Sequence, residues 1–510
     1  MSPVSMKRAS MKSGETLSQP PSDYIGGQFR PLPGDTVVSR NPADPDEVIW
    51  SGGPRLEHVD DAVAAARAAW SAWSAAPIED RIAALRRWQK SCQAHAEQLA
   101  GLITDEMGKI LAESRMEAGA LASKVDITLD EHSMARVREY DIPVSATRTG
   151  FCRFKPHGVM AVIAPFNFPS HLANGHFVPA LLMGNTVILK PSEKVPAVGQ
   201  MLAEMMHKAD LPAGVFNVVQ GGGDVAAQLV NHEDIDGILF TGSWPVGKRI
   251  LEANLDRPGR IIALEMGGNA PAVVMPSADL KQAVVECIRA CFATTGQRCT
   301  CTRRIIVHRD IADRFIRGFC KAASLLLIGS GRSEEPVFMG PVVNERSADA
   351  VIEFQSKLAR AGGRILVEAT RVDRPGAFVT PSVIEVDSFS LERDEEVFGP
   401  LVQICIVDDL EAAIEQANMT RYGLVSAIFT NDDGEWEQFF RESRAGCINR
   451  NNGTAGASSK LPFGGIGHSG NHRPAGAFSV DYCAYPVANM VENGLDAPIP
   501  VGMKWADEWL

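Results

Sequence analysis

The chain has 510 residues, 45% hydrophobic and 22% charged, so it is long enough for several domains and too apolar for wholesale disorder. Its 50 lysines and arginines against 62 aspartates and glutamates give a net charge of −12, which argues against nucleic acid or an anionic membrane as its partner. Ten cysteines are too few for a disulfide scaffold, and the sequence has no run of about 18 apolar residues that would cross a membrane. We therefore expect a soluble protein of the cytoplasm.

The first half of the chain contains three stretches that differ in the spacing of their apolar residues. Residues 1–34 are largely polar and rich in proline, which predicts a disordered tail. From about residue 60 to 135, apolar residues recur at three- and four-residue spacing, which predicts helices. Short apolar runs then alternate with helical patterns, which predicts a parallel sheet covered on both faces; the runs lie at 158–165, 185–191, 215–221, 237–243 and 260–268.

A second alternating stretch runs from about residue 280 to 450, with RRIIVH, GGRILVE and VSAIFT as expected strands. Two successive α/β lobes predict a ligand cleft where the strand ends converge. The loop after residue 449 is rich in glycine, serine and asparagine and is long enough to indicate a functional segment. The closing DYCAYPVANMV alternates like a strand that pairs with another segment or subunit.

Cys299 is a candidate nucleophile. It lies in TTGQRCTCTRR just after a helical pattern, and the neighbouring Arg298 is expected to favour the reactive thiolate. An inert buried cysteine is one alternative. Another is a metal site, although the spacing C-x3-C-x7-C-x-C lacks the paired knuckles of zinc sites; its ligands would be Cys287, Cys291, Cys299 and Cys301.

Glu265 and Asn167 are candidate partners of this nucleophile. Glu265 ends the apolar strand of IIALEMGG, a position that suits a general base whose pKa is raised by partial burial. Asn167, between the two prolines of APFNFP, could donate a hydrogen bond to a developing oxyanion. A solvated strand-end glutamate and an ordinary turn asparagine are the alternatives.

Two further motifs are candidates for nucleotide binding, and a third places a carboxylate and a phenylalanine before a turn proline. FTGSWPVG carries Gly242, Ser243 and Gly247 at a strand–turn–helix junction, where glycines let the backbone approach a pyrophosphate. ILKPSE carries Lys190 and Glu193, which could bind ribose hydroxyls or form a solvated charge pair. EEVFGP places Glu396 and Phe398 before a turn proline, and a helix-end charge and a core phenylalanine are the plain interpretation.

The ordered set APFNFP, ILKPSE, FTGSWPVG, LEMGG, GQRCT, EEVFGP and PFGG resembles the aldehyde dehydrogenase superfamily from about residue 35 to 495. The stretches around PFNFPSHLANGHF and GASSKLPFGGIGHSGNHRP are most similar to members that oxidise N-succinylglutamate 5-semialdehyde in arginine catabolism. The resemblance implies an α/β fold with a Rossmann-like NAD-binding domain over 35–137 and 158–264 and a catalytic domain over 265–470. It also implies a β oligomerisation arm from 138–157 and 471–510, in a homodimer or homotetramer.

The resemblance also implies roles for the candidate residues. Cys299 would attack the aldehyde and form a thioester, while Asn167 and the Cys299 amide would hold the oxyanion. Glu265 would activate the water that hydrolyses the thioester.

The same resemblance assigns the nucleotide motifs to NAD. Lys190 and Glu193 would bind the adenine-side ribose, Glu396 the nicotinamide-side ribose, and Phe398 would lie near the ring. The loop of Gly242, Ser243 and Gly247 would lie near the pyrophosphate. Glu193 would favour NAD over NADP, because a carboxylate repels a 2′-phosphate.

A carboxylate of the substrate would be bound by the backbone amides of Gly456 and Ala457 and by the hydroxyl of Thr300, and no metal is implied. Two alternatives stay open. One is a dehydrogenase for another substrate, such as glutamate or succinate semialdehyde. The other is a catalytically silent binding protein on the same fold.

Overall fold

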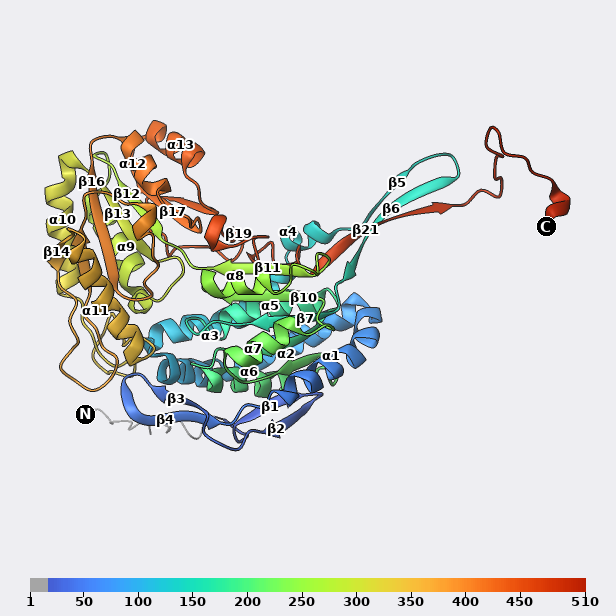
Figure 1. Cartoon of the computed structure of the whole chain (residues 1–510), viewed down its shortest axis with the longest axis horizontal. Coiled ribbons are helices and arrows are strands. Elements are labelled where there is room, and N and C mark those ends of the chain that lie inside the picture. Colours follow the sequence, from blue (N-terminus) through green and yellow to red (C-terminus); the bar gives the residue numbers. More distant parts are fainter. Residues whose placement is uncertain (1–16) are drawn as a thin grey trace, which may run out of the picture.

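The computed structural model describes residues 17–510, which form two α/β lobes and a thin arm that extends from the first lobe (Figure 1). Each lobe is built on a seven-stranded sheet with an apolar core on either face. The two lobes and their parallel sheets confirm the predicted alternation of strands and helices.

The sheet of the first lobe has the order β11-β10-β7-β8-β9-β1-β2. Strands β7 to β11 are parallel, whereas β1 runs antiparallel to β9 and β2. Every residue of β7 and β8 is buried, as expected of central strands covered on both faces. The strands are β1 (Ser22–Ile25), β2 (Gln28–Pro31), β7 (Val159–Ile163), β8 (Thr186–Lys190), β9 (Phe216–Val218), β10 (Gly237–Gly242) and β11 (Ile261–Met266).

Helices pack on both faces of this sheet, and those between residues 57 and 134 confirm the helical pattern of that region. Trp88 is fully buried among them, and its indole nitrogen donates to the Asn174 side chain at 2.9 Å. The helices are α1 (Glu57–Ala75), α2 (Ile78–Met107), α3 (Leu111–Leu129), α4 (Glu131–Met134), α5 (His171–Leu182), α6 (Pro196–Lys208), α7 (Gly223–Asn231) and α8 (Trp244–Glu252).

The N-terminal segment joins the first sheet. Buried Asp23 on β1 pairs with His58 at 2.7 Å and accepts from the backbone N–H of Gln220 at 2.6 Å. The disordered tail predicted over 1–34 is therefore wrong for residues 22–31, where two four-residue strands are too short to give a periodic signal. Residues 1–16 of that prediction lie outside the described residues. A hairpin of β3 (Val37–Asn41) and β4 (Asp44–Gly52) follows.

The sheet of the second lobe has the order β14-β15-β16-β13-β12-β17-β18 and is parallel except at β14. The strands are β12 (Ala270–Val274), β13 (Thr302–His308), β14 (Arg364–Val367), β15 (Ser382–Glu385), β16 (Leu401–Val407), β17 (Val425–Phe429) and β18 (Cys447–Arg450). The helices are α9 (Leu280–Phe292), α10 (Arg309–Ser324), α11 (Glu345–Arg360), α12 (Leu410–Asn418) and α13 (Asp433–Glu442).

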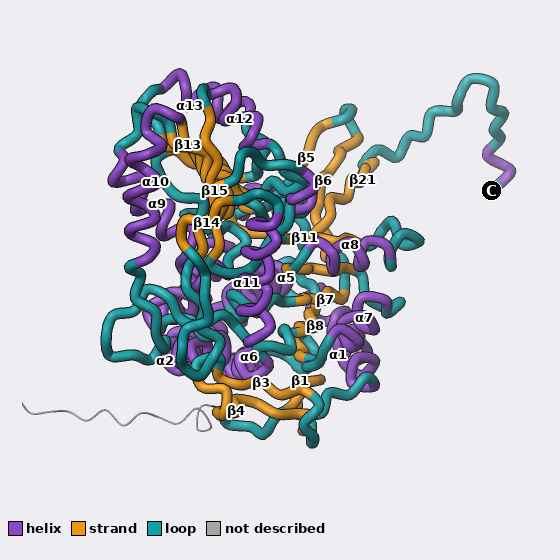
Figure 2. Tube along the Cα trace, turned by 60° about the vertical axis from the view of Figure 1, so that its left-hand side comes forward, coloured by secondary structure: helices purple, strands orange, loops and turns teal. Residues whose placement is uncertain are grey.

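The arm is a three-stranded antiparallel sheet in the order β21-β6-β5 (Figure 2). It pairs a hairpin of β5 (Tyr140–Pro143) and β6 (Arg148–Pro156) with β21 (Ala484–Glu492). Residues 471–483, which the sequence assigned to this element, instead pack on the first lobe, where Val480, Tyr482 and Cys483 are core residues. A short pair of β19 (Pro462–Phe463) and β20 (Ala475–Gly476) precedes them.

Within residues 17–510, none of the helices combines the length and the apolar character that crossing a bilayer requires.

Deletion of residues 1–31 should lower the midpoint of thermal unfolding by roughly 5 °C or more, because it exposes the edge of β9 and removes Asp23 from His58 and Gln220. Differential scanning fluorimetry measures this shift. Deletion of residues 1–16 is the matched control, since it leaves every described contact of β1 in place. Equal midpoints for the two truncations would contradict a structural role for β1 and β2.

Candidate active site

The candidate site lies at the carboxyl ends of the first-lobe strands, where the second lobe meets them. Strands β8 and β9 lie on one side of β7, and β10 and β11 lie on the other, so the loops after β7 and β10 leave the sheet in opposite directions. Ligands of doubly wound sheets bind at such a crevice. Lys190 ends β8, Gly242 ends β10, Glu265 lies near the end of β11, and Asn167 follows β7.

Cys299 follows η3 (Ala293–Gly296), a tight turn at the end of α9. Thr294 and Thr295 both have a φ of 55°, a strained conformation for residues with a side chain. Gly296 has a φ of 71°, and a Cβ there would lie 2.1 Å from the Gly399 carbonyl oxygen. The position of the thiol at the crevice therefore has a conformational cost. Burial raises the pKa of Cys299 well above its usual value, and Glu265 adds to this shift.

The cation that acts on Cys299 is not the one expected from the sequence. Arg298 pairs with Glu113 at 2.9 Å and lies over the Phe168 ring, so the prediction that it favours the Cys299 thiolate is wrong. Arg303 on β13 instead opposes the rise in the pKa of Cys299. It is buried and donates to backbone carbonyls of the nucleophile loop, including that of Arg298 at 3.0 Å.

Asn167 is brought to the nucleophile loop. Its buried side chain donates from Nδ2 to the carbonyl of Gln297 at 3.0 Å, two residues before Cys299. A primary amide carries two hydrogens, so a second donor is left for an oxygen atom bound beside the thiol.

Glu265 is 1% exposed, and neither of its carboxylate oxygens has a hydrogen-bond partner among the described residues. Burial raises the pKa of Glu265 well above its usual value, and Arg473 opposes this shift. A buried carboxyl without partners costs stability, and it is typical of a group kept for acid–base chemistry. Its charge also influences Cys299, so the two groups belong to one site.

Glu396 and Phe398 approach the same crevice from the second lobe. Glu396 accepts from the backbone N–H of Gly268 at 2.9 Å and lies 3.7 Å from Arg303. Burial raises the pKa of Glu396, and Arg303 opposes this rise. The Phe398 ring packs edge-on against Phe166, with centroids 5.8 Å apart, in the loop that also carries Asn167.

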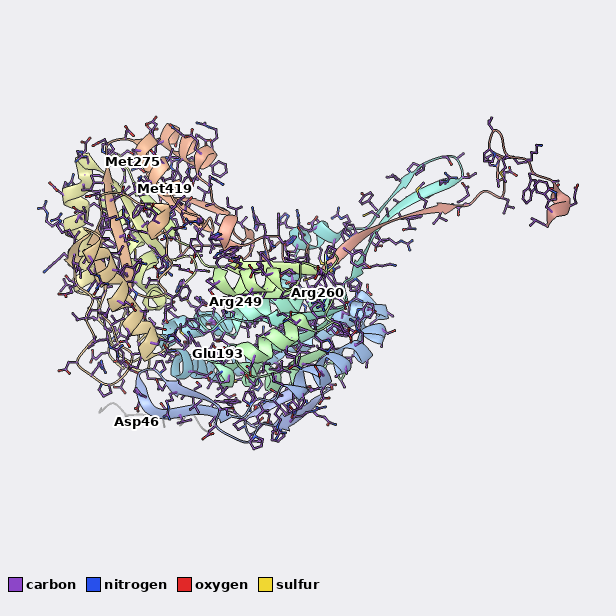
Figure 3. The ribbon with its side chains drawn as sticks, viewed as in Figure 1. Asp46, Glu193, Arg249, Arg260, Met275 and Met419 are labelled. Carbon is purple, nitrogen blue, oxygen red and sulfur yellow. The ribbon has the colours of Figure 1, made fainter. Side chains whose placement is uncertain are left out.

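Lys190 and Glu193 form an ion pair at the end of β8. Lys190 is buried at the end of β8, and its Nζ lies 3.4 Å from the carboxylate of Glu193, which is half-exposed. Burial lowers the pKa of Lys190, while Glu193 opposes this shift. Both Glu193 and Arg249 of α8 belong to the first lobe (Figure 3).

The FTGSWPVG motif after β10 differs from the expectation that its glycines let the backbone approach a pyrophosphate. Ser243 is the N-cap of α8, and its side chain makes no capping hydrogen bond. Gly247 lies inside α8, and a Cβ there would meet Met266 Sδ at 2.3 Å. Gly247 therefore allows close packing of α8 on the sheet. In the first turn of α8, Pro245 has no N–H and the Val246 N–H donates to the Ser243 carbonyl at 3.1 Å, so the backbone N–H of Trp244 is the donor there that could approach a phosphate.

Thr300, Gly456 and Ala457 belong to two neighbouring segments. The Thr454 hydroxyl donates to the Thr300 carbonyl at 2.6 Å, which ties the loop to the residue after the nucleophile. Gly456 and Ala457 are exposed, whereas Ser459 lines a small cavity that also contains Glu265. The loop therefore starts beside the thiol and ends beside the carboxyl group.

The sequence patterns missed four charged residues around the site, because each lies inside a helix or strand without a recognisable motif: Glu113, Glu117 and Lys124 on α3, and Arg303 on β13. For Arg303 the signal was an arginine pair at the start of an apolar strand. For the three residues of α3, the signal was that a predicted helix carries charged side chains. The structure shows that these side chains are buried. The described residues contain no group of three or more possible metal ligands, and all ten cysteines are free.

Comparison with known proteins gives consistent matches along the chain. The model of the aldehyde dehydrogenase family matches residues 31–486. The chain is 41% identical over 468 residues to the N-succinylglutamate 5-semialdehyde dehydrogenase of Novosphingobium aromaticivorans, covering 92% of this chain and 98% of that protein. It is also 41% identical over 480 residues to the protein of the same name from Paraburkholderia xenovorans, covering 94% and 98%.

Solved structures agree with these sequence matches. HpcC from Thermus thermophilus superposes with a TM-score of 0.90 at 29% identity, covering 96% of both chains. A 1-pyrroline-5-carboxylate dehydrogenase from Thermus with bound NAD superposes with a TM-score of 0.88 at 28% identity, covering 94% of both chains.

Proposed function

The chain belongs to the aldehyde dehydrogenase family, and we propose that it oxidises N-succinyl-L-glutamate 5-semialdehyde to N-succinyl-L-glutamate with NAD, in arginine catabolism. The substrate rests on about 41% identity to relatives of that name over more than 90% of the chain. The chemistry rests on one observation, the convergence of a thiol, a partnerless buried carboxyl and a side-chain amide at one crevice.

Cys299 is the proposed nucleophile. Its thiolate forms a bond to the aldehyde carbon, and the carbonyl oxygen becomes an oxyanion. The Asn167 amide and the backbone N–H of Cys299 donate to that oxygen, and a donor of this kind contributes about 100- to 1000-fold to the rate. Loss of hydride from the same carbon leaves a thioester on Cys299.

The residues of the crevice fit a dinucleotide. Lys190 is a buried cation with only a distant partner, Ser243 leaves the N-terminus of α8 uncapped, and Glu396 is a buried carboxylate. These groups would hold ribose hydroxyls and a pyrophosphate, with Phe398 near the ring. When bound, NAD supplies the hydride acceptor.

Glu265 is the proposed base for the second half of the reaction. It takes a proton from a water molecule whose oxygen attacks the thioester carbon, and the C–S bond breaks to release the acid and restore the Cys299 thiolate. The raised pKa of Glu265 makes its ionised form a stronger base than an exposed glutamate.

Glu193 supports NAD rather than NADP. Its carboxylate is half-exposed beside Lys190, where it can accept from a ribose 2′-hydroxyl and would repel a 2′-phosphate. For the substrate, the amides of Gly456 and Ala457 and the hydroxyl of Thr300 are the proposed carboxylate donors, since the loop is tied to Thr300 through Thr454.

We also propose that the protein is a homodimer or homotetramer in the cytoplasm, with the arm as its oligomerisation element. The arm carries exposed apolar side chains, among them Tyr140 at 61% and Met490 at 56%. An extended edge of this kind is an aggregation hazard unless another chain covers it.

A substrate panel tests the proposed function through the absorbance of NADH. We expect kcat/KM for N-succinylglutamate 5-semialdehyde to exceed that for glutamate or succinate semialdehyde by at least about tenfold, with NAD preferred over NADP. A higher value for another semialdehyde would reassign the substrate. NAD binding without NADH formation from any aldehyde would favour a silent binding protein.

Two variants test the assigned chemistry in pre-steady-state kinetics. Cys299→Ala should show neither a burst of NADH nor turnover, because no thioester can form. Glu265→Gln should keep a burst while steady turnover falls about 100-fold or more, because only hydrolysis loses its base. A Glu265→Gln enzyme without a burst would assign Glu265 to an earlier step.

A further inference from the structure

Lys124 is a buried cation that the proposed chemistry does not use. It is 3% exposed on α3, and its Nζ donates to the Gly476 carbonyl at 3.0 Å and to the Ser479 hydroxyl at 2.7 Å. An ammonium group has three hydrogens, so one donor is left over. Among the described residues no carboxylate lies within ion-pairing distance of Lys124. A buried charge without a counter-ion is costly, so an anion bound beside Lys124 would be stabilised.

Lys124 faces a cavity that also reaches the proposed base. The cavity has a volume of about 40 Å³, roughly the space of one carboxylate group or one water molecule. Its walls come from three parts of the chain: α3, the start of α5 with the neighbouring strand ends, and the two loops that precede the arm. The lining residues are Lys124, His171, Leu172, Gly175, His176, Thr241, Glu265, Ser459, Pro474, Ala475 and Gly476.

The two histidines of the cavity do not supply its positive charge. His176 is held by the Tyr482 hydroxyl and the Thr241 hydroxyl, both at 2.9 Å, and burial lowers its pKa to about 3. Burial also lowers the pKa of His171, whose Nδ1 has no partner among the described residues. Both rings are therefore neutral, and Lys124 is the one cation on the cavity wall.

We propose that Lys124 is a specificity-determining residue that binds a carboxylate of the semialdehyde substrate, with the unpartnered Nδ1 of His171 beside it as a further polar contact. This inference rests on the proposed function, because it needs an aldehyde that carries a carboxylate. Binding of that carboxylate at Lys124 would fix one end of the substrate, so that the aldehyde end is directed to Cys299. It also explains how a chain with a net charge of −12 binds an anion.

A purely structural role for Lys124 is the competing explanation, since the residue links α3 to the segment 476–479. The two roles differ in their dependence on substrate charge. A structural defect changes the oxidation of every aldehyde, whereas loss of an ion pair changes only that of charged ones.

The test compares kcat/KM for N-succinylglutamate 5-semialdehyde with kcat/KM for hexanal. Lys124→Gln keeps a donor toward Gly476 and Ser479 but removes the charge, and it should lower the ratio of the two values by about 100-fold. Ser479→Ala is the matched control, because it removes a hydrogen bond of Lys124 and keeps the charge. Its ratio should stay within about threefold of the wild-type value.

Ser459→Asp gives a second route if Lys124→Gln does not fold. Ser459 lies on the half-exposed loop across the cavity, and an aspartate there would pair with Lys124 and repel the substrate carboxylate. The ratio should fall again, and Ser459→Asn, which matches aspartate in size, should lower it much less. An unchanged ratio in Lys124→Gln, or equal effects of Ser459→Asp and Ser459→Asn, would overturn the inference.

The outcomes also separate this inference from the proposed function. If the wild-type enzyme does not oxidise N-succinylglutamate 5-semialdehyde, the proposed function fails, and the ratio is measured with glutamate or succinate semialdehyde instead. If it oxidises the substrate and the ratio is insensitive to Lys124, only the inference fails. If it oxidises hexanal but no aldehyde that carries a carboxylate, both fail.

Discussion

Two carboxylates one helical turn apart on α3 hold the loops that carry Asn167 and Cys299, one in each lobe. Glu113 accepts from the backbone N–H of Thr294 at 3.0 Å and from Arg298 at 2.9 Å, which fixes the loop before the nucleophile. Glu117 accepts from the backbone N–H and the hydroxyl of Ser170, at 3.0 and 2.8 Å, which fixes the loop that carries Asn167. One helix therefore sets the position of the thiol relative to Asn167, its proposed oxyanion donor.

The same region contains buried charged groups and a strained backbone, both of which lower the stability of the fold. Buried Glu117 pairs with buried Lys109, whose ammonium lies 3.4 Å from the centroid of the Phe168 ring. Thr294 keeps a left-handed backbone conformation that its hydrogen bonds to Glu113 help to hold. Glu265, in contrast, has no hydrogen-bond partner among the described residues to stabilise its charge. Hydrogen bonds and ion pairs thus position the loops, while Glu265, the proposed base, has no hydrogen-bond partner among the described residues.

The sequence predicted the strands and helices that produce a local pattern of apolar and polar residues. Apolar runs indicated β7, β8, β10 and β11, and the strand-end residues Asn167 and Glu265 followed from them. The patterns missed β1, whose four residues show no alternation and whose pairing with β9 is distant in the chain. They also misassigned the cation near the thiol, because neighbours in sequence need not face the same way: Arg298 turns to α3. The role of Lys124 depends on contacts with residues about 350 positions away, which no local pattern contains.

The hydrogen bonds of Glu113 make α3 the element that positions the loop of Cys299. The rate of the NADH burst in Glu113→Ala measures this positioning, because the burst reports thioester formation and Glu113 does not touch the thiol. We expect a burst at least about 100-fold slower than in the wild-type enzyme, as when a reacting group is misplaced by about 1 Å, with NAD affinity unchanged. A burst at the wild-type rate would contradict it.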